Sequence, residues 1–192
     1  MIEFYSLYSD RLNLNGDQAN VAVLRKRLSW AGIESRLTVI TDLSNLREMD
    51  PKGRFLMVGH GSAAAMRSFG EQAPVIRQEI RELAEKGWTG LAVGSGYELL
   101  FPDTPRTERQ SDYADVPAHG SMPRLHGYVN SDAQLPVVQV IGSSFVCTMV
   151  HGPVIARTPE LANWFFERMG VAVPATTESL EADSYAEGAN QH

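Results

Sequence analysis

The sequence predicts a three-layer α/β fold, in which a mostly parallel sheet lies between two layers of helices. Short apolar runs, each the length of one buried strand, alternate with stretches whose apolar residues recur at helical spacing. Two of the runs, Arg54–Val58 and Trp88–Val93, lead directly into glycine-containing turns that open helices. Because the succession of strand, tight turn and helix is the repeating unit of parallel sheets, this order indicates the α/β class.

The first elements follow this pattern clearly. We expect a buried strand at Ile2–Leu7 and then a helix at Gln18–Trp30, with Asp17 as its N-cap. Gly32 follows the helix, in the position where glycine commonly closes one. The run Arg36–Thr41 is rich in β-branched residues and predicts a second strand.

Two further strand-to-helix units follow along the chain. Arg54–Val58 predicts a third strand, and the turn after it opens a short helix at Ala63–Met66. A proline in the first turn favours a helix over Pro74–Lys86. Trp88–Val93 predicts a fourth strand, followed by the short apolar segment Tyr97–Phe101.

The C-terminal half is less regular. Residues Pro102–Arg124 contain four prolines, many charges and no periodicity, which is typical of a lid, a binding loop or a disordered segment. The later predicted elements are strands at Leu125–Val129, Leu135–Ile141 and Phe145–Val150, and a helix near Pro159–Met169. We therefore expect one domain over residues 1–174 and a flexible acidic tail over residues 175–192.

Composition and charge exclude several classes of protein. Of the 192 residues, 43% are hydrophobic and 21% are charged, which is ordinary for a globular protein and argues against disorder of the whole chain. The formal net charge of −6 argues against a nucleic-acid partner, which needs a basic surface. The basic cluster Arg25–Arg27 lies late in a predicted helix, where an exposed helix face accounts for it.

The single cysteine and the absence of long apolar segments exclude further classes of protein. One cysteine, Cys147, excludes a disulfide framework and a cysteine-rich zinc site. The sequence shows no signal-peptide pattern and no apolar stretch near the roughly 20 residues of a membrane span. We therefore expect a soluble, cytoplasmic protein with no cofactor, no bound metal and no membrane span.

The turn Gly59-His60-Gly61-Ser62 is the first candidate site. Backbone N–H groups of a glycine turn at a helix N-terminus can approach an anionic ligand. A tight turn that needs positive φ explains the same residues equally well.

The segment Ala92–Leu100 is the second candidate, because a strand that breaks into a sharp turn and a helix has the geometry of a nucleophile elbow. Gly94, at the apex, has no side chain. Ser95 beside it is the nucleophile available there, but Val93 and Tyr97 stand where a hydrolase elbow has glycines.

Histidines supply the remaining candidates. His151 ends a strand just before a Gly-Pro pair, at the carboxyl edge where open α/β sheets keep their sites. Cys147 precedes it by four residues, about 13 Å along a strand, so we expect a buried thiol and no Cys–His pair. His119 and His126 flank the end of the irregular segment and are expected to be exposed loop residues, since no carboxylate pattern accompanies them.

Taken together, these segments resemble the class I glutamine amidotransferases in their CobB/CobQ branch, and most closely the GatD-type subunits of lipid II isoglutaminyl synthases. Leu7–Arg27 is similar to the family's opening strand, Gly-Asp turn and first helix. Gly59–Gly61 stands where the family has a Gly-Gly-Gly oxyanion loop, and Ala92–Leu100 stands at its Ala-x-Cys-x-Gly-Tyr-Gln-Leu-Leu elbow. Thr148–Pro153 and Thr158–Ala162 match its catalytic-histidine segment, whereas residues 102–142 match poorly.

The resemblance implies a flavodoxin-like α/β fold and a known chemistry. In the family, the elbow cysteine attacks the side-chain amide of glutamine, a histidine activates it, and backbone N–H groups hold the oxyanion. The released ammonia passes to a synthetase partner. For GatD-type subunits this partner is a Mur-ligase-like enzyme that amidates a peptidoglycan precursor, and for CobQ relatives the product is an amidated corrinoid of cobalamin synthesis.

This sequence departs from the family at the residues that react. The cysteine position is Gly94, the glutamine position after the elbow is Glu98, and His60 stands in the middle of the oxyanion loop. His151 remains as the counterpart of the family base, and without a thiolate no acyl-enzyme forms. The resemblance places Gly59, His60, Gly61, Gly96 and Glu98 around the pocket for a glutamine-like small ligand.

We therefore predict a degenerate amidotransferase-like subunit without glutaminase activity, acting as a partner or regulatory module of a Mur-ligase-like synthetase. Two alternatives stay open. One is an active amidotransferase or hydrolase that uses Ser95 or activated water, which requires Ser95 Oγ within hydrogen-bond reach of His151. The other is an unrelated small-ligand-binding or protein-binding α/β domain, which a pocket filled by side chains would favour. In the amidotransferase reading, Gly94 and His151 must converge at the carboxyl ends of the strands.

Overall fold

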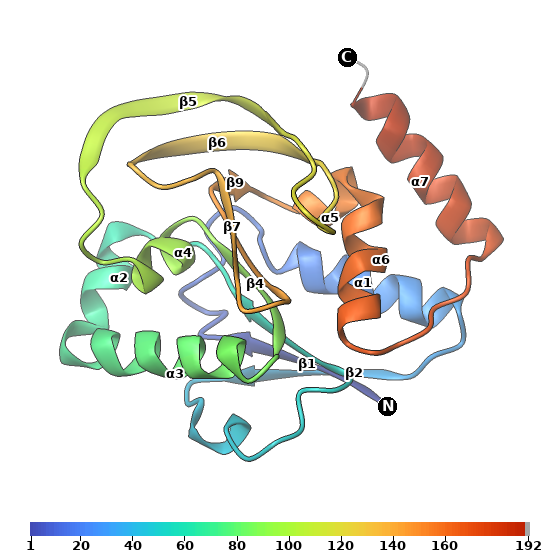
Figure 1. The fold of residues 1–192 in the computed structure, drawn as a ribbon, viewed down its shortest axis with the longest axis horizontal. Helices are drawn as coiled ribbons and strands as arrows, with labels where there is room; N and C mark the ends of the chain where they lie inside the picture. Colours follow the sequence, from blue (N-terminus) through green and yellow to red (C-terminus); the bar gives the residue numbers. More distant parts are fainter. Residues whose placement is uncertain (191–192) are drawn as a thin grey trace.

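The central sheet of the computed structural model, which describes residues 1–190, contains six strands in the order β2-β1-β3-β4-β8-β7. Neighbouring strands are parallel except β7, which runs antiparallel to β8. The bounds are Ile2–Leu7 (β1), Ser35–Ile40 (β2), Arg54–Val58 (β3), Thr89–Val93 (β4), Val138–Ile141 (β7) and Phe145–Thr148 (β8). The predicted fold class is confirmed, since the sheet is mostly parallel and carries helices on both faces (Figure 1).

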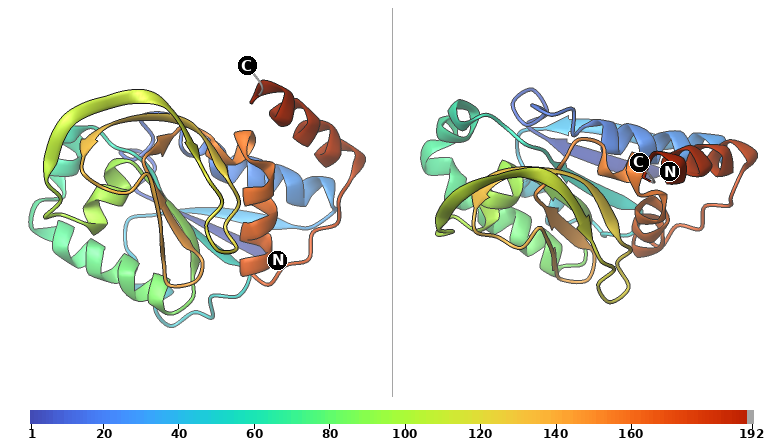
Figure 2. Two further views of the ribbon diagram at one scale, coloured as in Figure 1. Left: turned by 45° about the horizontal axis from the view of Figure 1, so that its top comes forward. Right: turned by 90° about the horizontal axis from the view of Figure 1, so that it is seen from above.

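The helices form the two outer layers. Their bounds are Ala19–Trp30 (α1), Ala63–Ser68 (α2), Ala73–Glu85 (α3), Ser95–Leu100 (α4), Val154–Arg157 (α5), Pro159–Arg168 (α6) and Thr177–Ala189 (α7), with 3-10 turns at Ser44–Leu46 (η1) and Gly70–Gln72 (η2). Figure 2 shows α1 and α7 together on one side of the sheet and α3 on the other. Phe165 of α6 packs edge-on against Phe55 of β3, with ring centroids 5.1 Å apart, so α6 also closes the core.

The prediction of an irregular segment over Pro102–Arg124 is wrong for most of its length. Residues Arg106–Val116 form a long strand, β5, which pairs with β6 (Leu125–Ala133), and β6 pairs with β9 (Val150–His151) in a second, antiparallel sheet. Residues 106–113 are all exposed, so this strand has no apolar alternation to reveal it. Backbone pairing with β6 specifies it instead, and the four prolines flank the strand rather than interrupt it.

The run Phe145–Val150, predicted as one strand, divides between the two sheets. Its first four residues form β8 in the central sheet, whereas Val150 and His151 form β9. The hydroxyl of Thr148 accepts a hydrogen bond from the Val150 N–H at 3.0 Å, where the chain leaves the first sheet. This switch carries His151 across to the second sheet.

Residues 177–189 of the expected flexible acidic tail form a helix, α7, which the sequence analysis did not predict. Its N-terminus has a capping box in which the side chains of Thr176 and Ser179 each bind the other's backbone N–H. Asp183 forms an ion pair with Arg27 of α1, whose side chain is only 6% exposed. Polar contacts rather than an apolar stripe hold α7, and its flexibility and the domain boundary at residue 174 stay predictions. Residues 191–192 lie outside the described part.

Asp183→Ala should therefore release α7 from the rest of the fold. Loss of the carboxylate leaves Arg27 buried without its partner, and we expect the free energy of unfolding to fall by about 2 kcal/mol. Hydrogen exchange of the α7 amides should accelerate, while exchange in β1 and β3 stays unchanged. Glu181→Ala, at an exposed position on the same helix, is the matched control. Unchanged α7 protection in Asp183→Ala would show that other contacts hold the helix.

Candidate functional site

Gly94 occupies a sharp elbow between β4 and α4. Its φ of 54° and ψ of −117° lie in a region that residues with a Cβ rarely adopt. Its N–H donates to the Thr148 carbonyl oxygen at 2.8 Å, and its carbonyl oxygen accepts from the Glu98 N–H at 2.9 Å. The backbone here therefore has the strand-turn-helix geometry expected of a nucleophile elbow.

Two histidine rings fill the space where a side chain of residue 94 would begin. A Cβ built on Gly94 would lie 2.6 Å from Cε1 of His151 and would overlap Nδ1 of His60. The two rings meet edge to face, with centroids 4.7 Å apart. The expected convergence of Gly94 and His151 is thus confirmed. The approach of His60 to the same position was not foreseen.

His60 is held as a neutral imidazole. Its Nδ1 accepts a hydrogen bond from the Ser95 N–H at 3.0 Å, which leaves the ring proton on Nε2. Burial, with a smaller contribution from the charge of His151, lowers the pKa of His60 from its ordinary 6.5 to about 4. The ring therefore stays uncharged at neutral pH.

His151 has both ring nitrogens engaged. Nε2 lies 3.4 Å from the Asn130 carbonyl oxygen, and because a carbonyl only accepts, Nε2 carries the proton. Nδ1 then accepts from the side-chain amide of Asn15, 2.9 Å away. A general base needs a free lone pair directed at the nucleophile, and this network leaves His151 none.

The backbone donors that would hold an oxyanion are also occupied. The N–H of His60 donates to Oδ2 of Asp17 at 2.9 Å, and the N–H of Gly61 donates to Oγ of Ser95 at 2.8 Å. The N–H of Ser95 is bound to His60. A tetrahedral oxyanion requires donors directed at it, so it would find no free one among these three amides.

The Ser95 hydroxyl is bound to the backbone of Gly61 and not to a histidine. It accepts from the Gly61 N–H and donates to the Gly61 carbonyl oxygen at 3.1 Å, and the residue is 8% exposed. In the described part of the chain, no hydrogen bond joins Ser95 Oγ to His151. The geometry that the hydrolase alternative requires is absent from residues 1–190.

Asp17 was expected to cap the first helix, and this was wrong. The helix has Gln18 at its N-cap with no side-chain cap, and Asp17 is fully buried. Its two oxygens accept from the backbone N–H groups of His60, at 2.9 Å, and Gly152, at 3.3 Å, so one carboxylate ties together the loops that carry both histidines. Burial raises the pKa of Asp17, and the two amide hydrogen bonds offset that rise only in part.

Sequence reasoning missed Asp17, Asn15 and Asn130 as site residues. The first two lie in the polar stretch before α1, where a turn and an N-cap explain the same residue types. Asn130 acts through its carbonyl oxygen, which no side-chain pattern reveals. A signal was available for Asp17 alone, since a Gly-Asp pair opens the helix in the family that the chain resembles.

The predicted ligand-binding glycines are needed for packing. A Cβ at Gly59 would overlap the carbonyl oxygen of Leu12, and one at Gly96 would lie 2.6 Å from the Gly59 carbonyl oxygen. A Cβ at Gly61 would lie 2.7 Å from a methyl carbon of Leu12. Close approach of neighbouring segments therefore accounts for all three glycines without a ligand.

Glu98 faces the second sheet. Its carboxylate forms a 2.6 Å ion pair with Arg106 of β5, which also binds Asp132 at 2.8 Å. Glu98 thus links α4 to the β5–β6 hairpin.

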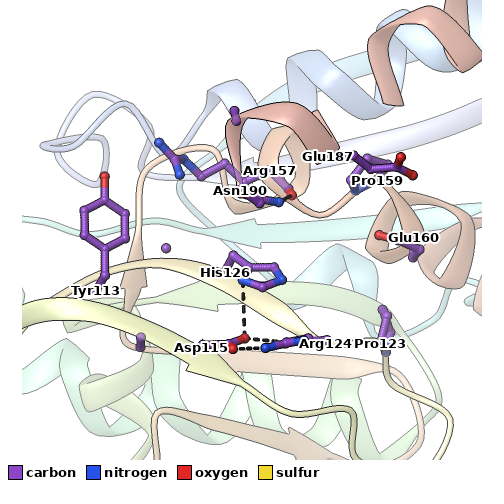
Figure 3. A pocket seen from close by; sticks show the side chains of 13 residues that line it. Tyr113, Asp115, Pro123, Arg124, His126, Arg157, Pro159, Glu160, Glu187 and Asn190 are labelled. Carbon is purple, nitrogen blue, oxygen red and sulfur yellow. Dashed lines mark hydrogen bonds and ion pairs between the residues drawn. The ribbon is translucent and has the colours of Figure 1, made fainter. Parts of the chain in front are cut away.

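The other candidate residues lie away from the elbow. Cys147 is fully buried, and burial raises the pKa of its thiol, as expected for a structural cysteine. His119 is exposed, as expected, whereas His126 is half-buried on β6 beside Asp115. His126 lines a pocket of about 980 Å3 between the hairpin and α5–α7, and neither Gly94 nor His151 contributes to its lining (Figure 3).

Acid should destabilise the protein through His60. The unfolded state binds the His60 proton near pH 6.5 and the folded state only near pH 4, so stability is lost as the pH falls through this window. His60→Asn, whose amide oxygen can accept from Ser95 N–H without titrating, should lose less stability between pH 7 and about pH 4. Urea unfolding of both proteins over this range measures the difference.

That pH comparison needs two controls. The raised pKa of Asp17 contributes the opposite slope, because its protonated form is favoured on folding, and this contribution is common to both proteins. His119→Asn changes an exposed histidine and should match the wild type at every pH. Equal acid sensitivity of wild type and His60→Asn would contradict the assignment to His60.

Comparison with known proteins supports the fold of the chain but assigns the chain to no particular family. No protein-family model matches the chain, and no curated protein matches it. A solved glutamine amidotransferase from Thermotoga maritima matches over 99% of this chain and 92% of its own, with a TM-score of 0.50 and 12% identity. A candidate protease I from Bacteroides thetaiotaomicron matches over 86% of this chain and 99% of its own, with a TM-score of 0.47 and 14% identity.

The chain therefore has a class I glutamine amidotransferase-like fold, with a mostly parallel sheet and flanking helices. Across residues 1–190, no helix combines the length and apolar character needed to cross a lipid bilayer.

Proposed function

We propose that this protein is a degenerate glutamine amidotransferase-like subunit without glutaminase activity. It acts as a partner or regulatory module of a Mur-ligase-like amide synthetase in the amidation of a peptidoglycan precursor. The synthetase partnership and the relation to the CobB/CobQ and GatD branch rest on the resemblance of residues 7–162 to that family.

One observation supports the proposed loss of glutaminase activity. Gly94 keeps the elbow backbone, but His60 and His151 together occupy the space above it where a nucleophile and its substrate carbonyl would meet. The neighbouring amide donors are bound to Asp17, Ser95 and His60. Nucleophile, base and oxyanion donors are thus unavailable together, so a single substitution is not expected to restore the reaction.

A glutaminase assay on the purified protein tests the first half of the proposal. We expect no release of glutamate above the blank, and the same result for Ser95→Ala and His151→Asn. Glutamate release that either substitution abolishes would overturn the proposal and favour the hydrolase alternative.

The second half of the proposal, the partner role, is tested with a synthetase present. We expect a Mur-ligase-like enzyme from the same source to co-purify with this chain and to amidate its substrate with ammonium salts but not with glutamine. Amidation that glutamine supports would contradict the loss of glutaminase activity. Failure of the two proteins to form a complex would contradict the partner role alone.

A second candidate function is a small-ligand-binding α/β domain unrelated to amide transfer. The observation that favours it is the filled elbow together with an open pocket elsewhere, beside His126. Ligand binding in that pocket without any synthetase complex would support this candidate over the first.

A further inference from the structure

The pocket beside His126 has charges of both signs on its walls that form no ion pair within residues 1–190. Its volume of about 980 Å3 is in the range of sites for small organic ligands. It lies between the β5–β6 hairpin and the segment from α5 to the end of α7, so residues of β5, β6, α5, α6 and α7 line it.

The positive wall consists of Arg157. Its guanidinium lies 5.5 Å from the ring centroid of Tyr113, over the ring, and Figure 3 shows it extended toward that tyrosine. None of the ion pairs formed within residues 1–190 includes Arg157. A guanidinium held against an aromatic ring with free N–H groups is well suited to bind a carboxylate.

The negative wall consists of Glu160 and Glu187, which Figure 3 shows on the opposite side of His126 from Tyr113. Neither carboxylate takes part in an ion pair within the described residues. Glu187 lies in the last turn of α7, where the helix carbonyl dipoles disfavour a carboxylate. A cation bound there would relieve this repulsion.

The floor of the pocket carries no unbalanced charge. Asp115 binds Arg124 and also lies 3.3 Å from Nδ1 of His126, which orients the imidazole. Burial, followed by the charge of Arg124, lowers the pKa of His126. A neutral imidazole therefore lies between the two walls and can exchange a hydrogen bond with a polar ligand.

We propose that this pocket binds a zwitterion of the amino-acid class, either a free aromatic amino acid or a short peptide that contains one. Its carboxylate pairs with Arg157, its ammonium group pairs with Glu160 and Glu187, and its aromatic side chain packs near Tyr113. A simple anion would face two carboxylates, and a simple cation would face Arg157. Only a ligand with both charges satisfies both walls.

Calorimetric titration of the full chain tests this with four probes. L-phenylalanine and glycyl-L-phenylalanine carry both charges, and comparing them distinguishes a free amino acid from a peptide. N-acetyl-L-phenylalanine keeps the carboxylate alone, and L-phenylalaninamide keeps the ammonium group alone. We expect one of the zwitterions to bind at least about tenfold more tightly than both single-charge probes. No binding by either zwitterion, or equal binding by the single-charge probes, would overturn the proposal.

Substitutions assign each charge to its wall. Arg157→Gln should weaken the zwitterion to the affinity of L-phenylalaninamide, and the double variant Glu160→Gln/Glu187→Gln should weaken it to that of N-acetyl-L-phenylalanine. Arg67→Gln, at an exposed position on α2, is the control and should leave binding unchanged. Urea unfolding confirms that each variant is folded. Wild-type affinity in the folded Arg157→Gln variant would show that the binding site is elsewhere.

Discussion

Gly94→Cys should lower the free energy of unfolding by about 3 kcal/mol. About 1–2 kcal/mol comes from placing a Cβ at positive φ. A similar amount comes from forcing that Cβ and its thiol against the rings of His60 and His151. Urea unfolding of the variant and the wild type measures the sum.

Gly120→Cys separates these two contributions. Gly120 also has positive φ, 58°, but a Cβ there meets nothing within 4 Å. This control should lose only the backbone part, about 1–2 kcal/mol. If Gly94→Cys and Gly120→Cys lose the same amount of stability, the rings of His60 and His151 move aside at no energetic cost. They would then not obstruct a side chain at residue 94.

The introduced thiol should also react differently from the native one. Cys147 is buried with a raised pKa and should resist iodoacetamide. A thiol at residue 94 lies against the neutral ring of His60 and against His151, whose ring nitrogens are both engaged, so neither ring favours the thiolate. It should be alkylated faster than the fully buried Cys147 but more slowly than the exposed thiol of Gly120→Cys. Removing the obstructing ring in Gly94→Cys/His60→Gly should increase the rate. Labelling of residue 94 as fast as of residue 120 would show that the two rings do not cover residue 94.

Asp17→Ala should have a comparable effect on stability, about 3 kcal/mol. It leaves the N–H groups of His60 and Gly152 without their acceptor, and each unsatisfied buried donor costs about 1–3 kcal/mol. Asp17→Asn keeps one acceptor oxygen and should lose about half as much. Chemical denaturation gives these values directly.

The same substitution should loosen the histidine pair. Hydrogen exchange should increase in the loops around His60 and Gly152, while α3 on the far side of the sheet stays protected. Asp10→Ala removes an exposed carboxylate from the neighbouring turn and serves as the control. If Asp17→Ala unfolds no more readily than Asp10→Ala, the buried carboxylate does not hold the two loops together.

Local patterns were sufficient for the strands and helices of the central sheet. Apolar runs such as Arg54–Val58 bury both faces, and the stripe of α3 faces the core, so each element carries its own signal. The meeting of Gly94 and His151 was also predictable, because Gly94 follows β4 and His151 follows β8 by three residues, and the carboxyl ends of these parallel strands share one edge of the sheet. The side chains that surround Gly94 and His151 were not predictable from the same pattern.

Elements without a core face escaped prediction. Strand β5 is exposed along most of its length and is specified by backbone pairing with β6, the next strand along the chain. Helix α7 is held by its capping box and by the ion pair of Asp183 with Arg27, 156 residues away. Neither kind of contact leaves a periodic pattern in the sequence.

The sequence by itself determined the fold class, the elbow at Gly94 and the absence of a cysteine there, because these depend on residue identity and local periodicity. Only the tertiary structure decided that the remaining site is closed. His60 enters the elbow because Asp17 holds its loop from 43 residues away, and His151 keeps no free lone pair because Asn15 and Asn130 approach it from separate segments. Hydrogen bonds between distant segments set tautomers and free donors, and residue order does not encode them locally.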